Sequence, residues 1–157
     1  MPQGVRTVYV PEAHDSTPTF GAAATLTRVF RELIAGSPAV FDAPAPQAEA
    51  VVELSIDSVG DAAGVTGVAP PGQAAPIAKY AVSMVGSLRM FDRDASIIWQ
   101  SGPVSVGEDY LAGLTDDPRP TASERVLSGT ENNRRRAVER AAERLARELY
   151  ARMVEGF

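Results

Sequence analysis

The sequence predicts an α+β fold, a two-layer sandwich in which two helices cover one face of a four-stranded mixed sheet, in the order β-α-β-β-β-α. Two observations lead to this prediction. Several segments alternate between apolar and polar residues, which is the period of a half-buried strand. Two other segments carry an apolar stripe at the helical period, and such stripes need an apolar sheet face to cover.

The chain opens with a strand and a helix. Residues 6–10 are β-prone and end at Pro11, which cannot donate to a sheet ladder. The first helix is expected over residues 19–35, with Thr19 as a candidate N-cap. Gly36 suits the left-handed position that often follows a helix, so the helix is expected to stop there.

A hairpin within residues 79–100 is expected to organise the sheet. Apolar and mixed residues alternate through its first strand, residues 92–95 are turn-forming, and a second apolar run follows. Residues 49–59 alternate in the same way and predict the strand before the hairpin. Residues 104–106 are candidates to extend the last strand.

The longest expected element is a helix over residues 130–153. Its apolar stripe recurs at helical spacing and consists of Val138, Ala141, Ala142, Leu145, Leu149 and Met153. The arginine run 134–136 lies at the expected start of this helix, where cations oppose the helix dipole. A solvated helix face in an arginine-rich chain accounts for the run without a function.

The length of 157 residues favours a single domain, residues 1–157. Within it, residues 60–76 contain many glycines, prolines and alanines without a regular period, which predicts a flexible insertion. No apolar run reaches the roughly 18–20 residues that a membrane helix needs. Residues 1–4 do not resemble the start of a signal peptide.

Composition excludes several classes of function. The net charge of −5 argues against nucleic acid as a partner. The absence of cysteine excludes disulfides, thiolate metal sites and a cysteine nucleophile. All but one of the fifteen basic residues are arginines, so arginine abundance alone is not taken as evidence of phosphate binding.

No persuasive catalytic or metal-binding motif is present, and we expect neither an enzyme nor a cofactor or metal site. Residues 14–16 contain the letters of a hydrolase triad, but adjacent residues do not aim at one another as a triad requires, so a turn is expected. The acidic pairs 108–109 and 116–117 lack the geometry of a glycosidase or calcium site and are interpreted as solvated loop acids. Trp99 is interpreted as core or rim packing.

Arg89 and Arg93 are the candidate ligand-binding residues. Arg89 lies on the mixed side of the central strand, so it is expected to point to the uncovered face of the sheet. Arg93 lies in the hairpin turn, and two guanidinium groups near one hairpin end can hold a phosphate. The alternative is a pair of solvated arginines beside Asp92 and Asp94.

Four segments, in this order, resemble the lipopolysaccharide-assembly lipoprotein family (LptE-like). Residues 8–17 resemble its first strand and polar turn, and residues 26–30 the start of its first helix. Residues 48–56 resemble its second strand. Residues 88–99, with Asp92 and a terminal Ile-Trp, followed by residues 108–110 and the helix segment 131–135, resemble the remainder. The likeness runs over nearly the whole chain and rests on order and spacing.

The resemblance implies two helices on a four-stranded sheet and a role without chemistry. Family members act as plug and assembly partner inside an outer-membrane β-barrel translocon and help lipopolysaccharide reach the outer leaflet. They lie on the periplasmic side of the outer membrane, anchored by an N-terminal lipidated cysteine. We expect that signal and cysteine to lie upstream of Met1. Lipopolysaccharide phosphate is then the candidate ligand of Arg89 and Arg93.

Two other functions stay open. One is an auxiliary envelope lipoprotein of a lipid ABC-transport system, which predicts association with an inner-membrane transporter. The other is a cytoplasmic enzyme or ligand-binding domain of the same architecture, which requires a deep pocket with converging polar groups.

Overall fold

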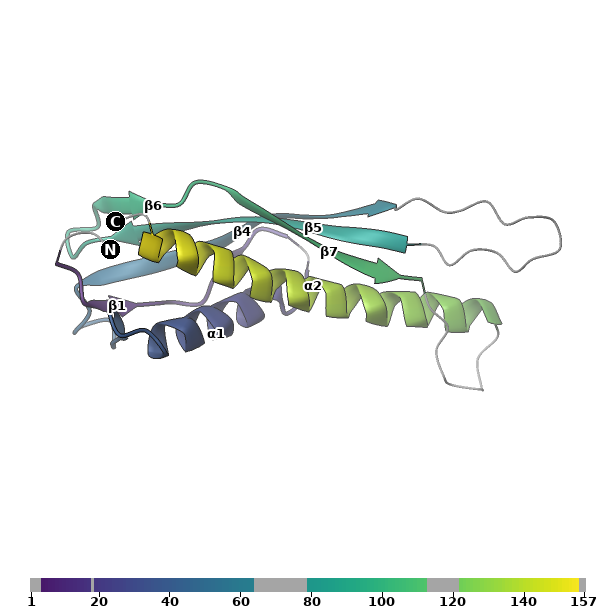
Figure 1. Ribbon diagram of the computed structural model, residues 1–157, viewed down its shortest axis with the longest axis horizontal. Coiled ribbons are helices and arrows are strands. Elements are labelled where there is room, and N and C mark those ends of the chain that lie inside the picture. Colours follow the sequence, from purple (N-terminus) through teal and green to yellow (C-terminus); the bar gives the residue numbers. More distant parts are fainter. Residues whose placement is uncertain (1–3, 18, 64–78, 113–121, 156–157) are drawn as a thin grey trace.

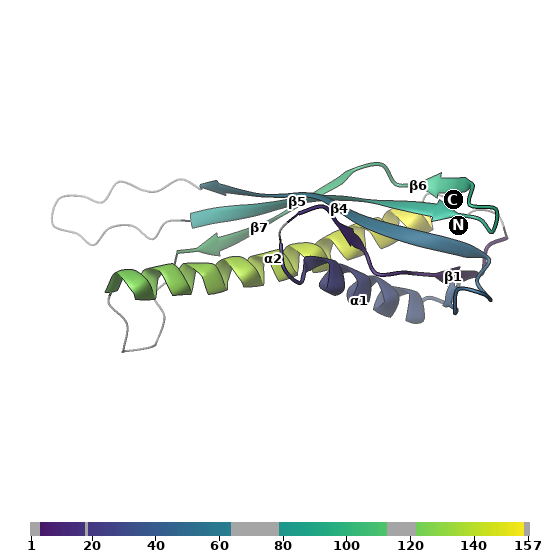
Figure 2. The same ribbon diagram turned by 180° about the vertical axis from the view of Figure 1, so that it is seen from behind.

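The computed structural model describes residues 4–17, 19–63, 79–112 and 122–155. Figure 1 shows an elongated sandwich in which one sheet lies above two helices, and Figure 2 shows the same layers from behind. Both helices lie on the same face of the sheet, as predicted. The elements in chain order are β1 (Thr7–Tyr9), β2 (His14–Asp15), α1 (Ala22–Ala35), β3 (Phe41–Asp42), β4 (Ala50–Ala63), β5 (Lys79–Phe91), β6 (Ile97–Gln100), β7 (Val104–Leu111) and α2 (Ala122–Glu155).

The sheet is mixed, as predicted, but the described residues form seven strands rather than four. The strand order is β3-β1-β4-β5-β6, with β2 also beside β4 and β7 also beside β5. β1 runs parallel to β3 and β4, and β2 runs parallel to β4. β5 pairs in antiparallel orientation with β4, β6 and β7. β1 corresponds to the first predicted strand, β2 and β3 are additional short strands in predicted loops, and β6 and β7 replace the last predicted strand.

Proline and glycine explain the end of β1 and the break between β6 and β7. Pro11 follows β1 and lacks the N–H that would continue its ladder. Gly102, with a φ of 65°, and Pro103 separate β6 from β7. At that break the side chain of Ser101 accepts a hydrogen bond from the Leu88 N–H at 3.0 Å, which keeps the backbone of β5 satisfied.

α1 begins at Ala22, later than predicted. Gly21 precedes it with a φ of 84°, and no side chain caps its first turn, so Thr19 is not the N-cap. Gly36 stops the helix with a φ of −84°, so the expected left-handed conformation is wrong. The predicted apolar stripe is confirmed, since the buried side chains include Leu26, Val29, Phe30 and Ile34.

α2 begins at Ala122, well before the predicted start at residue 130, and its 34 residues span roughly 50 Å. Gly129 resembles a helix boundary in the sequence, yet it lies buried inside the helix. Packing therefore outweighs the penalty of about 1 kcal/mol for an interior glycine. The arginine run 134–136 consequently lies in the helix interior, and the argument from the helix dipole does not apply to it.

The core lies between the sheet and the two helices. Alternate residues of the two long strands face it, among them Val52, Leu54, Ile56, Val82, Met84, Leu88 and Met90. α2 contributes two leucines together with four buried alanines, whose small side chains let the helix approach the sheet; these residues are Ala137, Ala141, Ala142, Leu145, Ala146 and Leu149. Trp99 is partly buried against this core, as predicted.

Residues 60–63 of the predicted insertion at residues 60–76 belong to a strand. β4 continues to Ala63, and its residues 60–63 pair with β5 from Ser83 back to Tyr80. Glycine and alanine in this stretch give no alternation of apolar and polar residues, so the sequence pattern did not predict a strand there. Residues 64–76 lie outside the described residues.

Candidate functional site

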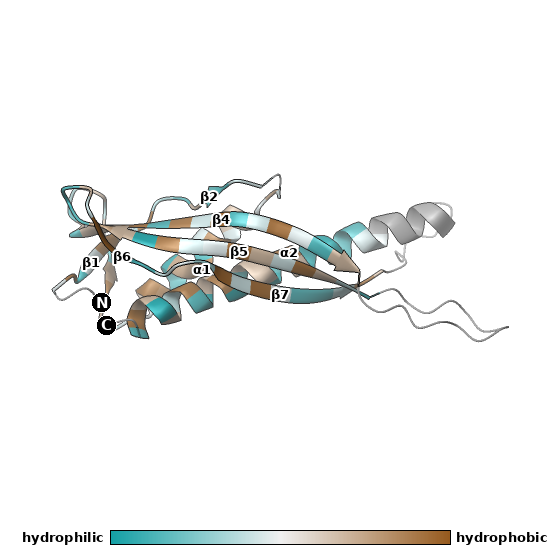
Figure 3. Cartoon of the chain, turned by 90° about the horizontal axis from the view of Figure 1, so that it is seen from above, coloured by the Kyte–Doolittle hydropathy of each residue, from teal (hydrophilic) through white to brown (hydrophobic). Residues whose placement is uncertain are grey.

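The face of the sheet opposite the helices is open, and Figure 3, which looks onto it, shows both hydrophilic and hydrophobic residues there. Arg89 points to this face, as the sequence predicted, because its neighbours Leu88 and Met90 are buried in the core. The other polar side chains near it on this face are Glu53, Ser55 and Ser87, and Val51, Val85 and Phe91 lie on the same face. The open face therefore combines a polar group around Arg89 with apolar side chains.

Acidic and polar groups surround Arg89. It lies opposite Glu53 of β4 and Gln100 of β6. It borders one shallow hollow of about 360 Å³ with His14 and Glu53, and another of about 460 Å³ with Asp57 and Gln100. These carboxylates would compete with an anionic ligand for the guanidinium group.

Arg93 borders a different hollow, of about 420 Å³, at the turn between β5 and β6. Its Nε donates a hydrogen bond to the carbonyl oxygen of Ala48 at 3.2 Å. Glu49 and Asp92 line the same hollow, and Arg89 does not. The structure thus places the two predicted arginines in separate hollows, and phosphate binding by them stays a prediction.

Glu49 ties the start of β1 to the start of β4. Its carboxylate accepts hydrogen bonds from the backbone N–H groups of Arg6 at 2.6 Å and Thr7 at 3.1 Å. These two bonds are the main reason why the pKa of Glu49 lies below its usual 4.5, and the charge of Arg93 also lowers it. Sequence reasoning assigned Glu49 only to a strand, because nothing local shows which backbone its carboxylate will reach.

A β-bulge changes which residues of β4 face the helices. The register with β5 shifts between Ile56 and Ser58, which leaves Asp57 as the extra residue. Because side chains alternate along a strand, one extra residue exchanges the two faces for the rest of the strand. Asp61 therefore points toward α2, whereas a regular strand would place it on the open face.

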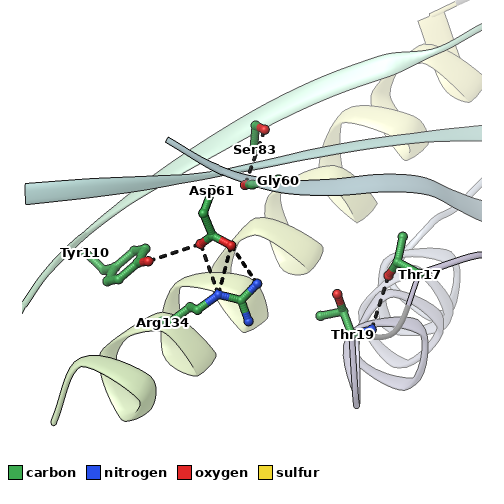
Figure 4. Close-up of polar contacts among 7 residues, drawn as sticks. All are labelled: Thr17, Thr19, Gly60, Asp61, Ser83, Tyr110 and Arg134. Carbon is green, nitrogen blue, oxygen red and sulfur yellow. Dashed lines mark hydrogen bonds and ion pairs between the residues drawn. The ribbon is translucent and has the colours of Figure 1, made fainter. Parts of the chain in front are cut away.

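Asp61 connects three elements through its carboxylate, as Figure 4 shows. Arg134 of α2 donates from Nε at 3.0 Å to each oxygen and from Nη2 at 2.8 Å to Oδ2. The Tyr110 hydroxyl of β7 donates to Oδ1 at 3.1 Å, and its ring stacks on Tyr80 with centroids 5.4 Å apart. Hydrogen bonding by Arg134 holds the pKa of Asp61 below its usual range, while burial and Asp61 raise the pKa of Tyr110.

We expect the Asp61–Arg134 pair to stabilise the fold at neutral pH and to lose this contribution in acid. The side chains are 35% and 30% exposed, so a double-mutant cycle of Asp61→Asn and Arg134→Gln should give a coupling of only about 0.5–1 kcal/mol. The folded pKa of Asp61 lies below the unfolded value of 3.8. The coupling is therefore complete above that value and declines as pH falls through the folded pKa. Urea unfolding of the four proteins between about pH 7 and about pH 2 measures it, and a pH-independent coupling would contradict the assignment.

The acidic pair at residues 108–109 lies on β7 and not in a loop, so that expectation is wrong. Glu108 lies 3.5 Å from Arg140 and 3.6 Å from Arg144, and Asp109 forms an ion pair with Lys79. Both carboxylates therefore have cationic partners on neighbouring elements. Residues 116–117 lie outside the described residues.

The expected turn lies at residues 15–17, but His14 and Asp15 also form the short strand β2, which was not predicted. The carboxylate of Asp15 accepts hydrogen bonds from the N–H of Thr17 at 2.8 Å and from its hydroxyl at 2.7 Å. Within the described part of the chain, no three His, Cys, Asp or Glu side chains gather in a way that could hold a metal ion. The helices of that part include none that is both long and apolar enough to span a bilayer.

The fold resembles several solved bacterial proteins. Hypothetical protein CT253 from Chlamydia trachomatis is 16% identical, with 95% of each chain covered and a TM-score of 0.54. A minor lipoprotein from Acinetobacter baumannii is 10% identical over 95% of this chain and 93% of that chain, with a TM-score of 0.50. Protein XCC0632 from Xanthomonas campestris is 12% identical over 93% of this chain and 81% of that chain, with a TM-score of 0.50. At these identities the likeness shows the fold alone.

Sequence similarity identifies the family. No curated protein shows significant similarity to the chain. The model of a family described as LptE, lipopolysaccharide-assembly, matches residues 5–153 and so includes every described helix and strand up to the last turn of α2. The protein therefore belongs to the LptE lipopolysaccharide-assembly family.

Proposed function

We propose that this protein is a non-enzymatic component of lipopolysaccharide transport and assembly, acting as plug and assembly partner of an outer-membrane β-barrel translocon. The observation that carries the proposal is the family match over residues 5–153. The protein would act on the periplasmic side of the outer membrane, held there by an N-terminal lipid. Lipopolysaccharide would be its ligand and the barrel its protein partner.

The shape and polarity of the molecule support this role. α2 spans roughly 50 Å, and Figure 1 shows the long strands β4 and β5 lying along it. The open face of the sheet carries Glu53, Ser55, Ser87 and Arg89, polar groups of the kind that line the interior of an outer-membrane barrel. A long body with these polar groups on one face fits a polar lumen better than it fits lipid.

The polar groups buried in the core serve the fold. Among the described residues only Thr27 and Ser37 are buried polar side chains. The hydroxyl of Thr27 donates to the Ala23 carbonyl and accepts from the Ala13 N–H, both at 2.8 Å, and the hydroxyl of Ser37 accepts from the Ala39 N–H at 3.2 Å.

Affinity purification of the tagged protein from the bacterial envelope tests the proposal. We expect an outer-membrane β-barrel to be recovered with it in about equal amounts. Recovery of an inner-membrane ABC transporter in place of the barrel would favour the alternative, an auxiliary lipoprotein of lipid transport. Recovery without any membrane-protein partner would overturn both roles.

The two arginines provide a separate test of lipopolysaccharide binding. Because Arg89 and Arg93 border different hollows, each single change to glutamate should weaken binding to purified lipopolysaccharide on its own, by roughly tenfold. Both side chains are exposed, so the melting temperature should be nearly unchanged. Arg28→Glu, an exposed arginine on α1, is the matched control. Unaltered binding in the double variant would dismiss both residues, and an equal loss in the control would indicate a general charge effect.

A further inference from the structure

α2 closes the outer edge of β7. Three of its side chains donate hydrogen bonds to the carbonyl oxygens of three alternate residues of that strand. The pairs are Arg144 to Gly107 at 3.2 Å, Arg140 to Asp109 at 3.2 Å and Asn133 to Leu111 at 2.9 Å. Carbonyls of alternate residues point to the same edge of an antiparallel strand. An open edge invites another strand to pair, so these bonds protect the molecule on this side.

The first half of β4 is also covered, on the opposite side of the sheet. β1 pairs with Ala50 and Val51, and β2 pairs with Ser55 and Ile56. The N–H of Ser16 donates a further hydrogen bond to the carbonyl of Ile56 at 3.2 Å. This cover ends where the bulge begins.

The second half of β4, residues 58–63, has an open outer edge. On one side it pairs with β5 in regular register, from Ser58 opposite Val85 to Ala63 opposite Tyr80. No described residue pairs with its other side. Six residues span roughly 20 Å, the length of an ordinary strand. The bulge at Asp57 precedes this segment, so it does not interrupt the pairing of residues 58–63 with β5.

Small side chains leave this edge accessible. Ser58, Gly60, Ala62 and Ala63 are all exposed. Figures 1 and 2 show that α1 lies under one end of the sheet only, while β4 and β5 extend past it above α2. An extended chain can therefore approach the open edge without meeting α1.

We propose that the open edge of β4, residues 58–63, binds an extended basic segment of a partner polypeptide, which adds a strand in line with β2. Three carboxylates flank the edge, those of Asp15, Asp57 and Asp61, and Arg134 balances one of them. Lysine side chains on the incoming strand would complement this excess of negative charge. A second copy of this chain, with its net charge of −5, would bring like charges together. The inference rests on the proposed function only in that the barrel is the first partner to examine.

Cysteine cross-linking in intact cells tests the proposal, since residues 1–157 contain no cysteine that would compete with an introduced thiol. Ala62→Cys places a thiol on the open edge, and Ser105→Cys places one at an exposed position on β7, the closed edge. With a bifunctional thiol- and amine-reactive reagent, Ala62→Cys should join a lysine-containing extended segment of one partner, at a yield about tenfold above that of Ser105→Cys. Mass spectrometry of the joined peptides identifies the segment.

Each result decides the matter. A cross-linked product with a basic segment of the barrel supports both the plug role and the edge proposal. A product with a basic segment of a different polypeptide supports the edge proposal and contradicts the plug role. A product with a second copy of this chain overturns the basic-partner proposal. Co-purification of the barrel without any cross-linked product at Ala62→Cys overturns the edge proposal alone. If neither the barrel nor a cross-linked product is recovered, both the plug role and the edge proposal are overturned.

The charge of the partner has its own test. Asp57→Lys should lower the rate of cross-linking from Ala62→Cys about tenfold at low ionic strength, and added salt should reduce the difference. Asp94→Lys, at an exposed position in the turn between β5 and β6, is the matched control and should leave the rate unchanged. Equal rates for the two variants would overturn the basic character of the segment.

Discussion

Replacement of Gly86 by alanine is expected to destabilise the protein by about 3 kcal/mol or more, at the upper end for overpacking a core. A Cβ at this position of β5 would lie 2.4 Å from the carbonyl oxygen of Ser55 and 2.7 Å from Cδ2 of Leu145. The closer of these atoms belongs to the backbone of β4, so no change of rotamer relieves the clash. The methyl group would force β4 away from β5 or α2 away from the sheet.

Gly107 of β7 provides the matched control. A Cβ there would meet nothing closer than the carbonyl oxygen of Val82 at 3.7 Å, which is ordinary contact. Gly107→Ala should therefore change stability by no more than about 0.5 kcal/mol. Gly86→Ala should lower the melting temperature by roughly 10 °C, measured by circular dichroism. Similar melting temperatures for the two variants would contradict the close packing of α2 on the sheet.

Local periodicity predicted the layers and the faces of this fold. The alternation in β5 separated Leu88 from Arg89 correctly, because the direction of a side chain in a strand depends only on its position in the alternation. The stripe from Leu26 to Ile34 likewise predicted the buried side of α1. Two apolar stripes and one apolar sheet face leave few ways to bury all three, so the two-layer arrangement followed.

Features that depend on a partner strand or helix could not be predicted in this way. The bulge at Asp57 is defined only by the pairing of β4 with β5. The position of Asp61 on the helix side of the sheet depends on the same pairing. The early start of α2 depends on packing that places Gly129 inside the helix. Local signals at residues 128–130 favour a boundary, and tertiary contacts overrule them.

The candidate arginines show the same limit. Sequence position correctly placed Arg89 on the open face and Arg93 in the turn. The direction of Arg93 depends on the carbonyl of Ala48, which lies far from it in the chain and accepts its hydrogen bond. The spacing of four residues therefore could not show that the two guanidinium groups border different hollows.

Phe30 is the second position at which a large loss of stability is expected. Its side chain is fully buried in α1, and its ring meets that of Tyr150 on α2 edge-on, with centroids 6.1 Å apart and an interplanar angle of 77°. Phe30→Ala would remove the apolar contact and leave a cavity where α1 and α2 meet on the sheet. The expected cost is about 3–5 kcal/mol, because the two helices and the sheet cannot all close on the vacated volume.

Phe20→Ala is the matched control for Phe30→Ala. It lies just before α1 and is 99% exposed, so Phe20→Ala removes an identical group without opening a cavity. That variant should stay within about 0.5 kcal/mol of the parent protein in urea unfolding. Phe30→Leu, which keeps much of the volume, should lose less than about 1.5 kcal/mol. Because burial alone separates Phe30 from Phe20, equal losses in the two alanine variants would mean that α1 does not dock on α2 as described.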